Sequence, residues 1–369
     1  MKTEHEFTGL DHLRALAITL VFLFHYTIFR HPAWMDGFQH YGWTGVDLFF
    51  VLSGFLISNQ LFAEKQRRNT VSLKIFYIKR SLRILPPYLF ILLIYIFFPA
   101  FHEREKLAPL WKMFTFTQNF NQDISVYGTF SHAWSLCVEE QFYLLFPLTL
   151  LFIWSTRMKK NPGWLIPAFF LLPLVLRWII WTWFLLPIEG SDEFGMNWYR
   201  LIYYPTFTRI DGLMAGIALA AVYRFKNYWL TPFRRFANYI SILVFLLLIL
   251  SYFTIANGHS LAATLLGFSG IALLYGLLTL AAISPGSFLF RFRSFVTRQL
   301  AVLSYSIYLS HKGLIHLSQT IFSRIGIAAE GTTMFVICVI VCIAGAFLMR
   351  ICIERPAFVL RNEILKSLK

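Results

Sequence analysis

Residues 9–26 read GLDHLRALAITLVFLFHY, a stretch that is apolar enough for a lipid bilayer and yet carries ionisable side chains. Arg14 stands near its start and His25 at a depth where hydrocarbon would surround it. The two are eleven residues apart, which in an α-helix is about 20° beyond three full turns and about 16 Å along the axis. The spacing predicts a membrane helix with both groups on one face. The alternative is a surface anchor for Arg14 and a packing role for His25.

Similar apolar runs recur along the whole chain, each long enough to cross a hydrocarbon core about 30 Å thick. Of the 369 residues, 57% are hydrophobic and 14% charged, against about 25% charged in soluble proteins. The first run lacks a signal-peptide cleavage site. We predict an all-α fold, a polytopic bundle of about ten membrane helices near residues 12–29, 43–63, 82–100, 132–156, 164–187, 200–223, 236–255, 260–283, 300–322 and 332–353.

The basic residues are distributed unevenly between the loops. The net charge is +15, and most Lys and Arg lie in alternate loops, such as EKQRRNTVSLKIFYIKR at 64–80, whereas IEGSDEFGMN at 188–197 belongs to the opposite set. This is the positive-inside pattern. It predicts that both termini are cytoplasmic and that the basic surface contacts anionic membrane lipid, and it argues against a nucleic-acid partner.

The four cysteines all fall in predicted helices and form no C-x-x-C motif. They are Cys137, Cys338, Cys342 and Cys352. This placement predicts small core residues rather than a disulfide framework or a metal site.

Ionisable groups inside a membrane cost at least about 2.5 kcal/mol each, so they are functional candidates. His132, Glu139 and Tyr143 fall within about 20° of one line on the predicted helix 132–156, which favours Glu139 over Glu140 as the inward carboxylate. We therefore expect these three side chains to share one face.

A second carboxylate, Asp47, shares a face with Gly54 and Ser58 in GWTGVDLFFVLSGFLIS. Small residues permit close helix approach. Asp47 is therefore either a functional group or one partner of an interfacial charge pair.

Arginines mark two further helices. Arg80 and Arg83 in IKRSLRILPP lie three residues apart, and two forked guanidinium groups on one face suit a phosphate; the alternative is a membrane-surface anchor. In TFTRIDGLMAG, Arg209 and Asp211 point about 200° apart. Each of these two must therefore find a partner on another element.

The last two helices also carry polar groups. LSYSIYLSHKGLIH makes the run 300–322 unusually polar, with Tyr305, Tyr308 and His311. The final run ends in ICIERP, where Glu354 and Arg355 suggest a structural salt bridge.

Together these stretches resemble the acyltransferase-3 family of bacterial integral-membrane O-acyltransferases over nearly the whole chain. The resemblance rests on seven elements in order: Arg14-x10-His25, GWTGVDLFFVLSGFLIS, Arg80-x-x-Arg83, HAWSLCVEEQFY, RIDGLMAG, SYSIYLSH and the terminal ERP. It implies a bacterial inner-membrane enzyme that moves an acyl group, usually acetyl, from cytoplasmic acyl-coenzyme A to a hydroxyl of a cell-surface or exported glycan. We expect one integral-membrane domain over residues 1–369 without a fused periplasmic esterase-like domain, so that a relay would need a separate periplasmic transferase.

The resemblance and the chemistry of the residues together suggest roles for the polar side chains. His25 is the expected catalytic base, with Glu139 or Asp47 orienting its ring, and an acyl-histidine or an acyl-tyrosine at Tyr305 or Tyr308 is an open alternative. Acetyl-CoA is the expected donor, and no metal is expected. The remaining assignments are Arg14, Arg80 and Arg83 for acetyl-CoA, and His132, Trp134, Arg209, Asp211, Tyr305 and His311 for the substrate.

The sequence leaves the acceptor open among lipopolysaccharide, other exported polysaccharides, lipid-linked saccharides, peptidoglycan and small glycosides. The rival function is a glycan or lipid transporter, which would also need intramembrane charge. Transporters often show inverted repeats and paired broken helices, and neither is visible in this sequence.

Overall fold

The computed structural model describes residues 7–156, 158, 162–254 and 258–368, which fold into helices without a β-sheet. The predicted all-α fold is confirmed. The α-helices are α1 Gly9–Tyr26, α2 Thr44–Arg68, α3 Leu73–Phe97, α4 Leu110–Phe114, α5 Trp134–Ser155, α6 Leu165–Ile180, α7 Phe194–Trp198, α8 Asp211–Phe225, α9 Thr231–Arg235, α10 Ala237–Thr254, α11 Phe268–Ala282, α12 Phe288–Arg291, α13 Phe295–Arg324, α14 Thr332–Met349 and α15 Arg355–Ser367.

Four π-helical turns extend or join these helices. They follow α6, α7 and α14 and precede α11, at Trp181–Leu185, Tyr199–Tyr203, Arg350–Glu354 and Ala263–Gly267 respectively. The last helical turn before α5 is a 3-10 helix, Ser131–Ala133.

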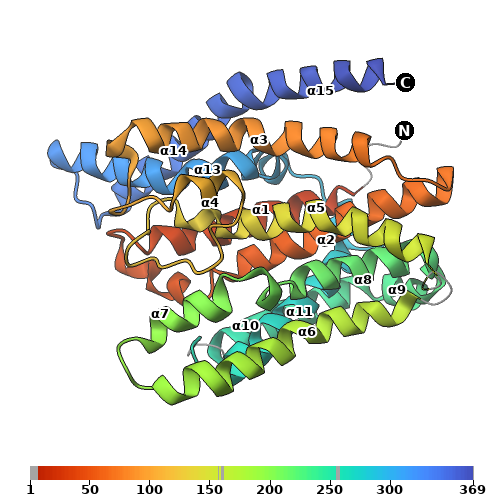
Figure 1. Cartoon of the computed structure of the whole chain (residues 1–369). Helices are drawn as coiled ribbons and strands as arrows, with labels where there is room; N and C mark the ends of the chain where they lie inside the picture. Colours follow the sequence, from red (N-terminus) through yellow and green to blue (C-terminus); the bar gives the residue numbers. More distant parts are fainter. Residues whose placement is uncertain (1–6, 157, 159–161, 255–257, 369) are drawn as a thin grey trace.

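Seven helical segments of the described chain are long and apolar enough to cross a membrane: 44–68, 73–97, 131–155, 162–188, 237–254, 263–282 and 332–367. Helices α1, α8 and α13 account for the other three predicted runs and lie inside the same bundle (Figure 1). Nine of the ten predicted runs thus correspond to a long helix, whereas the run 200–223 is broken at 204–210 and its α-helix begins only at Asp211.

The start of α1 and the end of α15 lie at the same end of the bundle, and the segment that contains α9 lies at that end too (Figure 1). Helix α7 lies at the opposite end. The basic stretch 64–80 comprises the end of α2, the short connection 69–72 and the start of α3, and the long connection 98–133 joins α3 to α5.

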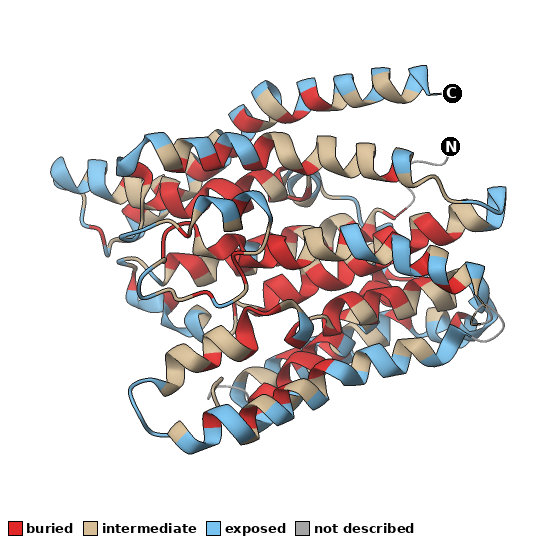
Figure 2. Ribbon diagram, in the orientation of Figure 1, coloured by how far each residue is buried: buried red, intermediate tan, exposed pale blue. Residues whose placement is uncertain are grey.

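Burial separates inner helices from outer ones. Most residues of the apolar part of α2 are buried (72%), whereas few residues of α10 are (17%). Outer helices such as α6 and α10 present long exposed faces (Figure 2), and these faces carry exposed apolar side chains such as Leu171, Phe245 and Leu246. A continuous apolar face of this kind suits contact with lipid rather than with water.

Two glycines bring α2 and α8 into close contact. A Cβ atom on Gly54 would lie 2.2 Å from the carbonyl oxygen of Leu213, and one on Gly216 would lie 2.2 Å from that of Val51. Larger residues would force the backbones apart, so the predicted close helix approach at Gly54 is confirmed.

The cysteine prediction is correct for three of the four residues. Cys137, Cys338 and Cys342 are buried, but Cys352 is exposed, and all four thiols are free. Cys352 lies in the π-helical turn before α15, where the helix leaves the packed interior.

Helices α1 and α13 run parallel, with contacts in step along both. The imidazole of His12 hydrogen-bonds the Thr297 hydroxyl at 2.8 Å. At the other end, the Gln319 side-chain amide donates to the Arg30 carbonyl at 2.7 Å. Residues midway along the side of α1 that packs on α13 therefore lie beside residues midway along α13.

Candidate active site

Three histidines from three elements meet in the interior of the bundle. His25 comes from α1, His132 from the 3-10 helix before α5, and His311 from α13. The ring centroids are 4.9 Å apart for His25 and His311, 5.7 Å for His25 and His132, and 5.0 Å for His132 and His311. All three are buried, with exposed fractions of 7% for His25, 2% for His132 and 0% for His311.

One hydrogen bond fixes the state of the His25 ring. The Nδ1 atom of His311 lies 3.0 Å from the carbonyl oxygen of Ile307 and 2.8 Å from that of Tyr308. Two carbonyl groups can only accept, so this Nδ1 carries a hydrogen. In neutral His311 the Nε2 atom is then an acceptor, and it lies 2.9 Å from Nδ1 of His25. His25 therefore donates through Nδ1 and keeps the lone pair on its own Nε2.

The side chain of Tyr308 packs beside the histidines. Its hydroxyl donates to the carbonyl oxygen of His132 and hydrogen-bonds the Ser135 hydroxyl at 2.7 Å. The ring of Tyr308 is 5.5 Å from that of His132 and 6.2 Å from that of His311, centroid to centroid. Tyr308 thus contacts the histidines on one side.

On its other side Tyr308 lines a cavity of about 120 Å³. All three arginines that are predicted to bind the acyl donor also line this cavity. Arg14 comes from α1, whereas Arg80 and Arg83 come from the first half of α3. The predicted residues Glu139 and Tyr305 line the same cavity, together with Ser53, Ser135 and Tyr143. We call this space the arginine cavity.

Glu139 belongs to the wall of the arginine cavity and does not orient His25. Its carboxylate accepts hydrogen bonds from the Ser53 hydroxyl at 2.8 Å and from the Tyr143 hydroxyl at 3.0 Å. The ring of Tyr143 in turn lies 5.7 Å from the guanidinium carbon of Arg80. The expectation that a carboxylate contacts the His25 ring is wrong, because His311 occupies that position.

The prediction that His132, Glu139 and Tyr143 share one helix face is correct for Glu139 and Tyr143 but wrong for His132. Glu139 and Tyr143 do face each other on α5, but α5 begins at Trp134 and His132 lies in the tighter 3-10 turn before it. A 3-10 turn has three residues per turn rather than 3.6. His132 therefore points to the histidines, while Glu139 points to the arginine cavity.

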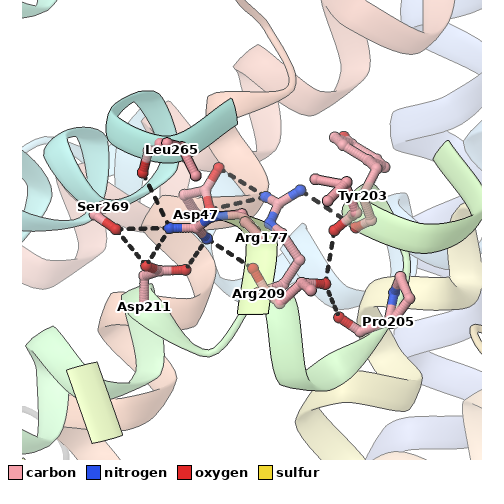
Figure 3. Close-up of polar contacts among 10 residues, drawn as sticks. Asp47, Arg177, Tyr203, Pro205, Arg209, Asp211, Leu265 and Ser269 are labelled. Atoms are coloured by element: carbon pink, nitrogen blue, oxygen red, sulfur yellow. Dashed lines mark hydrogen bonds and ion pairs between the residues drawn. The ribbon is translucent and has the colours of Figure 1, made fainter. Parts of the chain in front are cut away.

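Asp47 forms part of a buried charge network instead of the histidine cluster. Its carboxylate accepts from the Arg209 guanidinium at 2.9 and 3.1 Å, and the side chains are 1% and 0% exposed. Asp211 pairs in the same way with Arg177 at 2.8 and 3.0 Å and also accepts from Ser269. Figure 3 shows the two pairs side by side. The prediction that Arg209 and Asp211 find separate partners is confirmed.

Aromatic rings enclose this charge network. The guanidinium carbon of Arg209 lies 4.0 Å from the ring centroid of Phe268, 4.6 Å from that of Tyr203 and 5.3 Å from that of Trp134. Trp134 therefore packs on Arg209. Buried pairs with satisfied hydrogen bonds hold helices in register, and this network joins α2, α6, α8 and α11.

The terminal salt bridge also differs from its prediction. Glu354 is buried, accepts a hydrogen bond from Ser306, and pairs with Arg350 at 3.3 Å rather than with Arg355. The π-helical turn over Arg350–Glu354 places the side chains of residues 350 and 354 next to each other. The side chains of Glu354 and Arg355 point in different directions, because adjacent residues on a helix diverge by about 100°.

Sequence reasoning missed three buried charged groups. Arg177 stands alone in the apolar run of α6, and a single intramembrane charge is itself a signal of function or pairing. Lys312 follows His311 directly and pairs with Glu103 at 3.0 Å, with side chains 3% and 1% exposed. Glu103 lies in a loop outside the predicted helices, so no helical spacing points to it.

No group of His, Cys, Asp and Glu side chains within the described ranges has a geometry that would hold a metal ion. The histidine cluster is instead suited to moving a proton, because one imidazole fixes the tautomer of the next. Arg14 lies about three helical turns from His25 along α1, and together with Arg80 and Arg83 of α3 it is suited to holding phosphate groups.

Comparison with known proteins agrees with this geometry. The family model described as an acyltransferase domain, that of the acyltransferase-3 family, matches residues 7–351. The peptidoglycan O-acetyltransferase OatA of Listeria monocytogenes is 30% identical over 331 residues, which are 84% of this chain and 49% of the relative. The O-acetyltransferase OatA of Staphylococcus aureus strain NCTC 8325 is 30% identical over 228 residues, 58% of this chain and 34% of the relative.

The chain thus spans about half the length, or less, of these curated relatives. No solved structure matches it. The family match runs from α1 to the π-helical turn before α15 and includes the arginine cavity and all three histidines. The chain belongs to the acyltransferase-3 family.

Proposed function

We propose that this protein is an integral-membrane O-acetyltransferase that moves an acetyl group from acetyl-CoA to a hydroxyl of a cell-surface or exported glycan. The observation that carries the proposal is the path from Arg14, Arg80 and Arg83 through their shared cavity to Tyr308, with His25 and His311 directly behind it. The family and the names of the two relatives support acetyl transfer to a glycan.

The arginine cavity suits the donor. Coenzyme A carries its phosphates at one end and the thioester at the other, joined by a slender arm. Arg80 and Arg83 present forked guanidinium groups that match phosphate oxygens, and Arg14 adds a third positive charge. The rise of about 16 Å from Arg14 to His25 is comparable to the length of that arm.

His25 then acts as the general base. Its Nε2 lone pair takes the proton of the acceptor hydroxyl while the hydroxyl oxygen attacks the thioester carbonyl carbon. A carbon–oxygen ester bond forms, the carbon–sulfur bond breaks, and the leaving thiolate takes up the proton from His25 as free coenzyme A. His311 holds the His25 ring in the tautomer that this step needs. Tyr308 separates the arginine cavity from the histidines, so we infer that its side chain turns aside when the thioester enters.

The proposed orientation has both termini and the arginine-rich end in the cytoplasm, where acetyl-CoA is made. The Lys and Arg asymmetry of the loops supports it, and the termini lie at one end of the bundle (Figure 1). We propose the bacterial inner membrane as its location and an exported glycan as acceptor, with peptidoglycan favoured by the name of the Listeria relative. A separate extracytoplasmic transferase is the partner expected if the acetyl group is relayed.

Thioester consumption by the purified protein tests this function. The protein in lipid nanodiscs is given acetyl-CoA and, as acceptor, a tetramer of β-1,4-linked N-acetylglucosamine, and release of free thiol is followed for wild type, for Arg80→Ala/Arg83→Ala and for the control Arg293→Ala, whose side chain is exposed and does not line the cavity. We expect thiol release from wild type and the control and much less from the double variant. No thioester consumption by wild type, together with movement of glycan across vesicles, would instead establish a transporter.

A further inference from the structure

The side chain of His132 is buried beside His25 and His311 and takes no part in the proton transfer described above. Its exposed fraction is 2%, and neither of its ring nitrogens makes a hydrogen bond of ordinary geometry with the described residues. Buried polar atoms are nearly always hydrogen-bonded, so an unpaired imidazole in a reaction centre needs an explanation. A substrate atom that enters the centre would supply the missing partner.

The backbone turn that carries His132 is held rigidly. Phe130 adopts the left-handed conformation with φ at 56°, which a bulky residue keeps only where its surroundings enforce it. The Gln118 side-chain amide donates to the carbonyl oxygen of Phe130 at 3.4 Å, and that of Gln122 donates to the carbonyl oxygen of Ser131 at 3.0 Å. These contacts fix the backbone on which the His132 ring stands.

A buried ion pair joins the same turn to α13. The ammonium group of Lys312 lies 3.0 Å from Oε1 of Glu103, with side chains 3% and 1% exposed, and it also donates to the Ser131 hydroxyl at 3.3 Å. The Oε1 atom of Glu103 accepts from the Phe130 backbone N–H at 3.0 Å as well. Lys312 directly follows His311 in the sequence. The ion pair therefore fixes the turn relative to the helix that holds the His25 ring in place.

The His132 ring is close enough to His25 to contact the same reacting group. The two ring centroids are 5.7 Å apart and the ring planes are inclined by 61°. A hydrogen bond spans about 3 Å between heavy atoms, so the two imidazoles can contact neighbouring atoms of one small group. His25 offers a lone pair to the attacking hydroxyl. A neutral His132 has one N–H group, which can donate to the carbonyl oxygen of the thioester.

We propose that His132 is a catalytic residue whose N–H stabilises the negative charge on the thioester carbonyl oxygen, and that Lys312 and Glu103 are positioning residues that hold it there. As the acceptor oxygen bonds to the carbonyl carbon, an electron pair of the C=O double bond moves onto the carbonyl oxygen. The His132 N–H donates a hydrogen bond to this oxygen and keeps its proton. When the carbon–sulfur bond breaks, the electron pair returns and forms the ester carbonyl.

The rigidity of the turn matters for this role. A donor that is in place before the charge develops needs no reorganisation during the reaction, which is the condition for strong electrostatic stabilisation. This inference rests on the proposed function, because it concerns the transition state of the same acetyl transfer.

Two variants at position 132 test the donor role. Thiol release from acetyl-CoA, with the acceptor tetramer present, is measured in nanodiscs for wild type, His132→Leu, His132→Gln and the exposed control His40→Phe. We expect His132→Leu to lower kcat about 10²–10³-fold, as the loss of one such donor does, while the KM for acetyl-CoA stays within about twofold because the arginines are unchanged. His132→Gln keeps an N–H donor and should be about 10-fold faster than His132→Leu.

The positioning role is tested by removing both charges of the ion pair. The double variant Glu103→Gln/Lys312→Met leaves no buried charge without its partner, and thermal unfolding confirms that it is folded. We expect its kcat to fall about 10-fold or more with little change in the KM for acetyl-CoA, because a small displacement of a catalytic group is costly. Lys312→Arg keeps the ion pair and should retain most of the rate, as should the control Lys106→Met at an exposed lysine of the same connection.

Each part of the proposal has its own contradicting result. A near-normal kcat for His132→Leu, or equal rates for His132→Leu and His132→Gln, would overturn the donor role. A near-normal kcat for the folded double variant would overturn the positioning role. Absence of thioester consumption by wild type would instead contradict the proposed function.

Discussion

The Nε2 atom of His311 lies 2.9 Å from the Nδ1 atom of His25, and both rings are buried. This contact makes His311 a positioning residue for His25. In serine proteases a carboxylate fixes the tautomer of the catalytic histidine; here a second imidazole, itself fixed by two backbone carbonyls, does so. A neutral partner costs less to bury than a carboxylate does.

Replacing His311 should therefore lower kcat without affecting substrate affinity. We expect His311→Phe to reduce kcat by about 10²-fold or more, since a wrongly held base loses most of its contribution. His311→Gln keeps an acceptor oxygen and should recover part of the rate. Steady-state kinetics of both variants, with His40→Phe as a control at an exposed position, checks this. Equal rates for His311→Phe and His311→Gln would show that the hydrogen bond does not matter.

The donor site predicts a difference between arginine and lysine at position 83. Arg83→Ala should raise the KM for acetyl-CoA about 10-fold or more, because a charge-assisted hydrogen bond contributes about 1.5–3 kcal/mol. Arg83→Lys should restore only part of the affinity, since a point charge lacks the bidentate fork. Titration with acetyl-CoA measures both values. Unchanged KM in both variants would identify Arg83 as a membrane anchor.

Two adjacent glutamates provide a matched pair of variants. Glu139 lines the arginine cavity and accepts from Ser53 and Tyr143, whereas Glu140 does not line it. We expect Glu139→Gln to lower kcat/KM for acetyl-CoA about 10-fold, because an amide accepts these hydrogen bonds more weakly. Glu140→Gln should change it less than about 2-fold, within the usual effect of a substitution away from such features. The opposite ranking would mean that α5 is rotated relative to this structure.

The network around Asp47 predicts a loss of stability rather than of chemistry. Asp47→Asn leaves Arg209 buried without its counter-ion, and breaking a buried pair costs about 3–5 kcal/mol. The double variant Asp47→Asn/Arg209→Met should regain much of the thermal stability. Thermal unfolding in detergent, with activity expressed per folded molecule, separates the effects. A stable but inactive Asp47→Asn protein would return Asp47 to the catalytic residues.

The sequence was sufficient to predict the helices, because bilayer thickness demands apolar runs of a fixed length. It also identified His25, Tyr308, His311 and the arginines by their polarity in such runs. Helical spacing shows which residues of one helix share a face. It does not show which other helix packs on that face. For Asp47 the spacing left open a functional group or an interfacial charge pair; the structure shows the charge pair, with Arg209 of a distant segment as the partner.

Two other differences have local causes. The 3-10 turn before Trp134 changes the direction of His132, and no sequence pattern marks the change from 3-10 to α geometry there. The Lys312–Glu103 pair joins α13 to a loop more than two hundred residues earlier in the chain. Such a contact depends on the tertiary fold, and only the unexplained charge of Lys312 in a buried helix signals that a partner exists.

The central claim is that His25 is the general base that takes the proton of the acceptor hydroxyl as this hydroxyl attacks the thioester. The most direct test is the rate of acetyl-CoA consumption by His25→Ala in nanodiscs with the acceptor tetramer present, measured beside its equilibrium affinity for acetyl-CoA. We predict that thiol release falls to the level of protein-free nanodiscs while the Kd for acetyl-CoA stays within about twofold of wild type, because the arginines that bind the donor are unchanged. A near-normal rate of thiol release by His25→Ala would contradict the account.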